Sequence, residues 1–383
     1  MTNTIIDIHI LQTLPPNNAN RDDTGSPKTA IFGGKRRARI SSQSWKHATR
    51  LDFATSLDNQ NLGIRTKRIV ELLADEIIRK APEMADKANE IAIEVYTSAG
   101  IKISKATSKS RQGADEAGYL LLLGRYQIER LAQEAIDLFR RGEDKEGKFT
   151  FDKALARKIL KENNPFDLAL FGRMVADTTD LNVDASVQVA HAISVHPIEN
   201  EYDYFTAVDE VKAASSASED AGAGMIGTVE FNSSTLYRFA NINVVELYKN
   251  LLDESMTKAA VTAFMESFIR SMPTGKQNTF ANRTLPDVVY VTLRSDQSIS
   301  FVGAFEDPIL ESDSQGIMRR AAERLASYAV EIESAYGTHS DHSWVIGVGD
   351  RGDSLKKIAE PVSLDQLLVS VKDSIGTRLG CMK

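Results

Sequence analysis

The residues with the most evident chemistry lie in the stretch KRRARISSQSWKHATR, residues 35–50, which carries six Lys or Arg and no Asp or Glu. Lys and Arg bind phosphates by charge, and the first N–H groups of a helix can do the same. Ser41 or Ser42 offers an N-cap, and the Ser and Gln side chains add donors that hold a backbone without selecting a base. The stretch therefore predicts a phosphate-binding helix start, with a solvated basic face as the alternative.

Two adjacent carboxylates, Asp22 and Asp23, precede this stretch and follow Arg21. In a loop after a strand, such a pair could act as general acid and base on a phosphodiester. The alternative is that Asp22 and Asp23 make turn hydrogen bonds or pair with nearby cations, and we favour that interpretation. His339 and His342 lack a third ligand, and the two GxGxxG matches lack the strand-then-helix context of a dinucleotide site. We therefore predict no metal and no cofactor.

The elements that must position these residues follow from periodicity. Residues 4–11 alternate, which predicts a half-buried strand, and the helix after Ser41 or Ser42 is expected to bury Trp45, Ala48 and Leu51 on one side. Residues 61–164 have helical spacing, with apolar positions such as Ile69, Leu72, Leu73, Ile77, Ile128, Leu131, Ala135 and Leu138.

Further along the chain, strands are predicted over 166–174, 185–195, 228–243, 287–294 and 343–348, and helices over 244–272, 316–336 and the C-terminal residues. If the helical block is an insertion, the remaining order of strand, helix, strand, strand, helix, strand is that of a ferredoxin-like sheet.

Charge is distributed unevenly over the 383 residues, whose formal net charge is -7. Residues 1–165 hold 28 Lys or Arg against 22 Asp or Glu, whereas residues 166–383 hold 18 against 31. The first part could face a polyanion while the second keeps the protein soluble. Cys381 is the single cysteine, which excludes an intrachain disulfide, and we find no signal peptide and no membrane-spanning run. A cytoplasmic protein is expected.

Seven segments occur in an order that resembles one family: NRDD, AIFGGKRRARISSQSWKHA, GRM, AHAI, YFTAVDE, FNSSTLYRFANIN and GKQNT. The chain is similar to the CasC family, the repeated backbone subunit of the type I-E CRISPR Cascade surveillance complex. The resemblance implies an α+β fold with a ferredoxin-like (RRM-like) palm, a helical fingers insertion and a β-hairpin thumb. The expected boundaries are palm 1–60, 166–198 and 231–383, fingers 61–165, and thumb 199–230.

The resemblance implies a non-catalytic RNA-binding protein of antiviral defence. Copies of the chain would multimerise along a CRISPR guide RNA (crRNA) as a helical filament, kink the RNA at regular intervals and present it for pairing with target DNA. The expected partners are the guide RNA, target DNA, other copies of the chain and other Cascade subunits, with no membrane and no cofactor. The alternative is a metal-dependent endoribonuclease that uses Asp22 and Asp23.

The resemblance also assigns site residues. RNA-binding positions are Arg21, Lys28, Ser41, Gln43, Lys46, Arg50, Lys276 and Gln277, with Met174, Phe205 and Thr206 bracketing a displaced nucleotide. The segment 199–227 has seven acids against Lys212 alone, so it cannot clamp RNA by charge, and an apolar wedge is the remaining mode of action. Cations of the helical block are expected to touch double-stranded DNA: Lys102, Lys105, Lys109, Arg111, Arg140, Arg141, Lys145 and Lys148.

Overall fold

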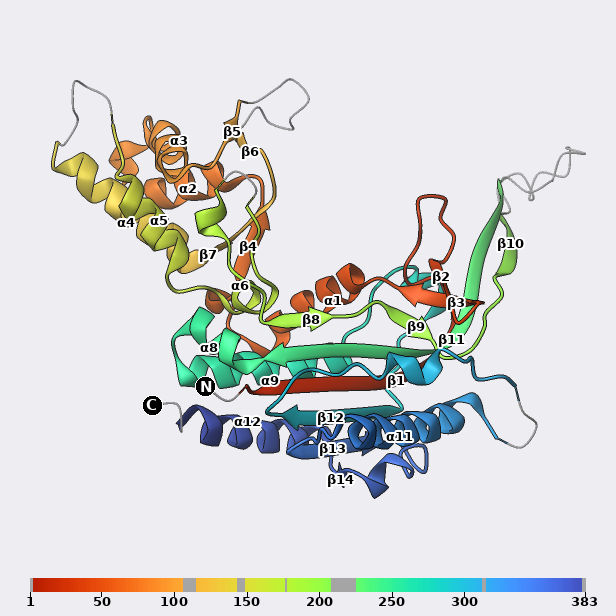
Figure 1. The fold of residues 1–383 in the computed structure, drawn as a ribbon. Helices are drawn as coiled ribbons and strands as arrows, with labels where there is room; N and C mark the ends of the chain where they lie inside the picture. The colour runs from red at the N-terminus through yellow and green to blue at the C-terminus, as the bar shows by residue number, and fades with distance from the viewer. Residues whose placement is uncertain are drawn as a thin grey trace, which may run out of the picture. The chain divides into compact units, whose positions relative to one another are not determined.

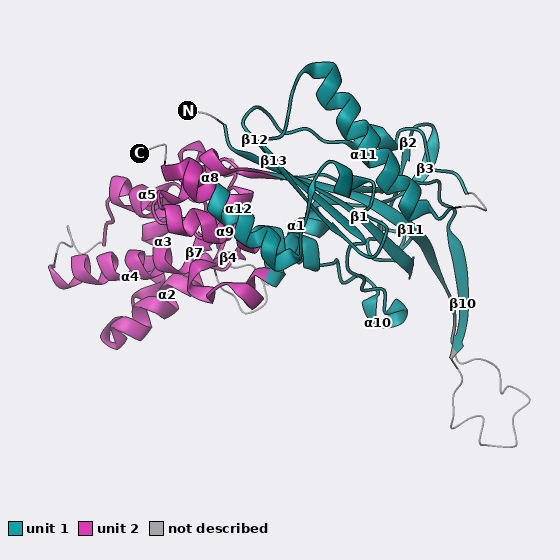
Figure 2. Ribbon diagram, turned by 90° about the horizontal axis from the view of Figure 1, so that it is seen from below, with its two compact units in different colours: residues 1–52, 189–241, 264–374 teal, residues 53–188, 242–263, 375–383 magenta. Residues whose placement is uncertain are grey.

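The computed structural model describes residues 3–105, 115–142, 149–175, 178–207, 225–311 and 315–380. The fold is α+β, with one large sheet and helices (Figure 1). The chain forms two compact units, residues 1–52, 189–241 and 264–374 in the first and residues 53–188, 242–263 and 375–383 in the second (Figure 2). No helix within the described ranges is long and apolar enough to cross a membrane.

The large sheet contains ten strands among the described residues, and eight of them follow the order β14-β13-β12-β1-β11-β9-β3-β2, while β10 and β8 pair with β11. The strands are β1 Ile5–Asn17, β2 Thr29–Phe32, β3 Lys35–Ile40, β8 Val187–Val189, β9 Ala192–Ser194, β10 Glu201–Ala207, β11 Met225–Asn243, β12 Val288–Arg294, β13 His342–Gly347 and β14 Glu360–Pro361.

Strand β1 is central, and it pairs antiparallel with β12 from Ile5 opposite Arg294 to Leu11 opposite Val288. The prediction of a half-buried strand is wrong, because Asp7, His9 and Leu11 on the second face are as buried as the isoleucines on the first. A strand with neighbours on both edges and helices over both faces has no solvent side.

The two faces of the sheet are covered by different helices, as adjacent residues of β11 show. Tyr237 and Phe239 belong to the core that α11 (Ile317–Tyr336) closes. Arg238 points to the opposite face, where its guanidinium stacks on Trp45 of α1 (Ser42–Ser56) and on Phe268 of α9 (Glu254–Arg270). The remaining helices of the C-terminal half are α8 Val244–Leu251, α10 Gln277–Phe280 and α12 Leu364–Gly380.

The predicted single helix over 244–272 is wrong, because the chain breaks into α8 and α9. Leu252 ends α8 with a left-handed φ of 55°, and the Asp253 carboxylate then accepts the Met256 N–H at 2.7 Å as an N-cap. Leu51 is also misplaced by the prediction: it is exposed on α1, whereas Trp45, Ala48 and Phe53 are buried.

The second unit is mainly helical and has its own core. Its helices are α2 Ile69–Lys80, α3 Ala88–Ala99, α4 Arg125–Arg140, α5 Lys153–Lys161 and α6 Phe166–Phe171, with small sheets β4 Gly63–Thr66 with β7 Leu121–Gly124 and β5 Ile103–Ser104 with β6 Glu116–Ala117. The predicted helical positions lie in this core, with Leu72 and Leu138 at its margin. The strand predicted over 166–174 is instead α6, whose first five residues are buried.

Candidate nucleic-acid interface

The site begins at the turn from β3 into α1. Ser41 is buried, and its hydroxyl accepts the Ser44 N–H at 3.3 Å, so Ser41 is the N-cap, one of the two predicted. Its own N–H donates to the Asn20 side-chain oxygen at 2.8 Å. The helix start is thereby tied to the loop that carries Arg21 and Lys28. The N–H groups of Ser42 and Gln43 precede the first backbone hydrogen bond of the helix, which Ser44 donates to the Ser41 carbonyl.

Helix α1 is fixed to the sheet by a buried stack. The Arg238 guanidinium lies 3.7 Å from the Trp45 ring centroid and donates to the Gln12 side-chain oxygen at 2.6 Å. Burial lowers the pKa of Arg238 to about 9, so it is still a cation at neutral pH. Gln43 is exposed and Lys46 and Arg50 are half-buried one and two turns later, and burial lowers the pKa of Lys46. The three residues follow one side of an anchored helix.

The Lys and Arg side chains of β3 differ in how deeply they are buried. Arg37 is fully buried, and its guanidinium donates to the backbone carbonyls of Ser194, Phe305 and Glu306 at 2.9 to 3.0 Å. Neither the predicted contact with phosphate nor the alternative of a solvated face holds for Arg37, because its side chain is buried. Lys35 and Arg36 are exposed and line a groove of about 720 Å³, where Glu199 and Glu230 also lie.

Arg39 lies beside Thr29 and His191. Its Nε donates to the Thr29 carbonyl at 3.1 Å, and its Nη1 lies 3.3 Å from the His191 Nδ1. Partial burial, followed by the charges of Arg39 and Lys28, lowers the pKa of His191. Sequence reasoning assigned no role to Arg39 or His191, although both belong to segments that carry the family resemblance.

The GKQNT segment packs beside the loop that contains Asn20 and Arg21. A Cβ at Gly275 would lie 2.3 Å from the Ala19 carbonyl oxygen, so only glycine permits this approach. Lys276 has a φ of 51° and precedes α10, which begins at Gln277. Because Ala19 adjoins Asn20 and Arg21, the structure brings Lys276 and Gln277 to the loop that contacts the start of α1.

Asp22 is a structural residue of that loop. Its carboxylate accepts the N–H groups of Thr24 and Ser26, each at 3.0 Å, and the Thr24 hydroxyl at 2.7 Å. These bonds, the hydroxyl first, lower the pKa of Asp22. Asp23 is exposed. Among the residues described, no group of three or more His, Cys, Asp or Glu side chains is arranged to hold a metal ion.

The β10–β11 hairpin carries Phe205 and Thr206. Phe205 lies opposite Gly227, and a Cβ on Gly227 would lie 2.4 Å from the Phe205 Cζ. The Phe205 ring therefore packs directly over the Gly227 backbone. Phe205 is 39 % exposed and Thr206 is exposed. Phe205 thus anchors its own hairpin and still presents part of its ring. Four acids of the segment 199–227 and its lysine lie outside the described residues: Asp209, Glu210, Lys212, Glu219 and Asp220.

Met174 belongs to the second unit and is 85 % exposed. The preceding Arg173 is buried and donates to the carbonyls of Leu181 and Leu160, both at 2.8 Å, and burial lowers its pKa to about 10. Of the cations predicted to touch DNA, Lys102, Lys105, Arg140 and Arg141 are exposed, and Arg140 pairs with Glu83 at 2.6 Å. Lys109, Arg111, Lys145 and Lys148 lie outside the described residues.

Two solved structures contain chains with a similar fold. A chain of a structure described as "CRISPR RNA-guided surveillance complex, pre-nicking" is similar with a TM-score of 0.85 and 34% identity, covering 97% of this chain and 100% of that one. A chain of a "CRISPR RNA-guided surveillance complex" is similar with a TM-score of 0.73 and 30% identity, covering 96% and 99%. A search of curated proteins found no match.

The family follows from the sequence match. This chain belongs to the CT1975-like protein family, Cas_CT1975, whose model matches residues 6–370. The resemblance to a CRISPR surveillance-complex subunit predicted from the seven segments is thereby confirmed.

Proposed function

We propose that this chain is the repeated crRNA-binding backbone subunit of a type I-E Cascade complex, with guide RNA, target DNA, other copies of itself and other Cascade subunits as partners. The observation that carries the proposal is the capped start of α1, which Asn20 ties to the loop of Arg21 and Lys28 and beside which the GKQNT segment packs. The similarity to chains of CRISPR RNA-guided surveillance complexes over nearly the whole length supports it.

In this proposal the first unit is a ferredoxin-like palm. Support comes from the adjacent strands β12-β1-β11-β9, with α1 and α9 over one face. The β10–β11 hairpin is the thumb, and the helical core of α2 to α5 is the fingers. The strands β13 and β14 and the helix α11 are then additions to the palm.

The phosphate-binding role of α1 is tested with Lys46→Ala and Arg50→Ala. Each variant should weaken RNA binding equally for all sequences, because a bond to phosphate carries no base information. The slope of log K against log salt concentration should fall by roughly one unit for each phosphate that the variant no longer neutralises. Binding is measured by titration of labelled RNAs of different sequence over a range of salt.

Lys357→Ala is the matched control, because Lys357 is an exposed lysine of the short 3-10 turn Leu355–Lys357. A loss of affinity that depends on the RNA sequence, or an equal loss with Lys357→Ala, would contradict the assignment.

The proposal also holds that the chain binds RNA without cutting it. The hydrogen bonds that the Asp22 carboxylate accepts from its own turn support this. Incubation of the protein with labelled RNA and Mg²⁺ or Mn²⁺ should leave the RNA intact. Metal-dependent cleavage that Asp22→Ala or Asp23→Ala abolishes would replace the proposal with the endoribonuclease alternative.

A further inference from the structure

The second unit contains a pocket of about 270 Å³ at the start of α4. It lies between the 3-10 turn Asn59–Asn61, the turn before α6 and the end of α8. Its lining residues are Gln60, Asn61, Gly124, Arg125, Tyr126, Glu129, Asn163, Asn164, Pro165, Leu251 and Met256. No predicted site residue is among them.

The walls of the pocket are held by hydrogen bonds. Asn164 is buried and donates to the Asn250 carbonyl at 3.2 Å. The Gln127 side chain accepts the Gly124 N–H at 3.0 Å and donates to the Glu162 carbonyl at 2.9 Å. The strand β7, the start of α4 and the turn 162–165 are therefore connected by hydrogen bonds around the pocket.

The lining combines amides with apolar surfaces. Four of its side chains are Asn or Gln, and three of these, Gln60, Asn61 and Asn163, are exposed. An amide offers a donor and an acceptor side by side, which matches the edge of a nucleobase. Tyr126 is 52 % exposed and presents an aromatic face, on which any base can stack. Leu251 and Met256 supply further apolar contact.

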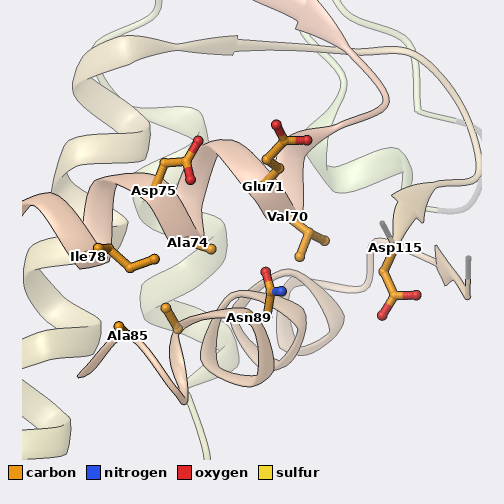
Figure 3. Close-up of a pocket in the computed structure, with 9 residues that line it drawn as sticks. Val70, Glu71, Ala74, Asp75, Ile78, Ala85, Asn89 and Asp115 are labelled. Atoms are coloured by element: carbon orange, nitrogen blue, oxygen red, sulfur yellow. The ribbon is translucent and has the colours of Figure 1, made fainter. Parts of the chain in front are cut away.

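Charge distinguishes this pocket from another of similar size in the same unit. The pocket of about 260 Å³ between α2 and α3 has Glu71, Asp75 and Asp115 and no cation in its lining, and Asn89 is its single amide (Figure 3). Three carboxylates repel a phosphate. The pocket at α4 has Arg125 and Glu129, which balance each other, so a nucleotide can approach it.

We propose that the pocket at the start of α4 binds a single unpaired nucleobase of a nucleic-acid strand. Ligand pockets commonly hold roughly 300 to 1,000 Å³, so about 270 Å³ suits one base rather than a stacked pair. The base stacks on Tyr126, the amides of Asn61 and Asn163 bond to its edge, and Arg125 lies toward its phosphate. The inference rests on the proposed function in one respect, that the chain meets a strand with bases outside a duplex.

The test measures binding of nucleoside monophosphates to the full chain by saturation-transfer NMR. The probes are AMP, CMP, GMP and UMP and their 2′-deoxy counterparts. Saturable binding is expected, and Tyr126→Ala, Asn61→Ala and Asn163→Gly should each weaken it about fivefold or more. Glycine is chosen at 163 because Asn163 has a φ of 52°, which glycine adopts without strain.

Asn89→Ala is the matched control, since it removes an exposed amide from the acidic pocket of the same unit. Stronger binding of ribonucleotides assigns the base to the guide RNA, stronger binding of deoxyribonucleotides assigns it to DNA, and equal binding means that the base alone is recognised. Absence of saturable binding, or an equal loss with Asn89→Ala, overturns the proposal.

Binding of guide RNA to the same variants separates the hypothesis of a base-binding pocket from the proposed function in crRNA binding. The pocket variants should leave unchanged the slope of log K against log salt concentration for RNA binding, which Lys46→Ala and Arg50→Ala lower. If the pocket fails its test while those two variants behave as expected, the proposed function stands without the pocket.

Discussion

Arg37 and Arg39 point to the same side of β3, two residues apart, and their guanidinium groups have different surroundings. Arg37 is buried against three backbone carbonyls, and Arg39 lies half-buried beside His191. Burial, rather than charge, decides which cation of the run can meet a polyanion. Arg37 acts as an internal donor that holds β3 to the segments around Ser194 and Phe305.

Arg37→Ala should therefore destabilise the fold. The substitution leaves the carbonyls of Ser194, Phe305 and Glu306 without the donors they now have, and buried unsatisfied groups cost about 1 to 3 kcal/mol each. A loss of about 3 kcal/mol or more in the free energy of unfolding is expected, measured by denaturant titration. Arg36→Ala, at the exposed neighbour, should change it by less than about 0.5 kcal/mol, and similar losses for both would refute this role.

Two buried titratable groups of β1 respond to pH in opposite directions. Burial raises the pKa of Asp7 from 3.8 to about 6 and lowers the pKa of His9 from 6.5 to about 3. Between pH 3.8 and 6 the folded state binds more protons than the unfolded state at Asp7, so this contribution to stability falls as pH rises. At His9 the unfolded state binds more protons between pH 3 and 6.5, so that contribution rises with pH.

In Asp7→Asn the pH dependence of the unfolding free energy should reflect His9 without the opposing effect of Asp7. In the unmodified protein the two slopes largely cancel between about pH 4 and 6, whereas the variant keeps the rising one alone. The change of the Asp7 pKa from 3.8 to about 6 corresponds to about 3 kcal/mol. Between about pH 4 and 7 the unfolding free energy of Asp7→Asn should rise by about that much more than that of the unmodified protein. Parallel pH profiles of chemical denaturation would show that Asp7 ionises normally.

The parts of the site that depend on neighbouring residues in the sequence could be predicted, and those that depend on distant segments could not. A Ser cap before an amphipathic helix is set by neighbouring residues, and Ser41 was one of two predicted caps. The approach of Gly275 to Ala19 joins segments distant in sequence, and only the resemblance grouped GKQNT with the basic stretch. His191 has no local signal, since its effect arises from the charges of Lys28 and Arg39 beside it in space.

Among the elements, most of the predicted helices and strands are present, whereas the strand predicted over 166–174 and the unbroken helix predicted over 244–272 are wrong. The helices α2, α4 and α11 and the strands β11 and β12 have patterns that local physics fixes. The run FDLALF is apolar on all sides because α6 is buried, and periodicity cannot separate such a helix from a buried strand. The break between α8 and α9 depends on Leu252 adopting a left-handed φ, which no residue type there announces.

The hairpin of β10 and β11 leads to a prediction about base pairing. If the exposed part of Phe205 from one copy and Met174 from another displace a nucleotide at regular intervals, that nucleotide cannot pair with DNA. Mismatches at those periodic positions should be tolerated and mismatches between them should be costly, because the wedge offsets unstacking (on the order of a few kcal/mol) only in the kinked form. The measurement is target affinity for single mismatches scanned along the guide in assembled complexes.

The same scan with Phe205→Ala should lose its periodicity, whereas Tyr202→Ala should retain it. Tyr202 is an exposed aromatic residue whose side chain leaves β10 on the opposite face from Phe205. A flat profile in the unmodified complex would exclude the wedge, and a periodic profile that survives Phe205→Ala would transfer the role to other residues of the hairpin.

At the scale of the whole molecule, the first 165 residues have more Lys and Arg than Asp and Glu, and some of these cations belong to the helical unit. Neutralising Lys102, Lys105, Arg140 and Arg141 should slow capture of duplex DNA and leave RNA loading intact, because electrostatic steering acts mainly on association. Stopped-flow association at several salt concentrations measures this. The control replaces Arg68 and Arg79, which pair with Glu71 and Glu76 on α2. A loss of RNA loading, or an equal slowing in the control, would show that the cations have another role.

The central place of β1 has a consequence for how the chain is made. Its partner residues on β12 are roughly 280 positions later, and a ribosome adds about 5 to 20 residues per second. The strand therefore leaves the ribosome roughly 14 to 56 seconds before its partner exists. For most of that interval Ile6, Ile8 and Ile10 have no strand to join, because β11, the other neighbour of β1, begins only at Met225. Nascent chains must therefore be shielded by chaperones or by transient collapse. A shortage of such shielding would limit the yield of this protein before any RNA is bound.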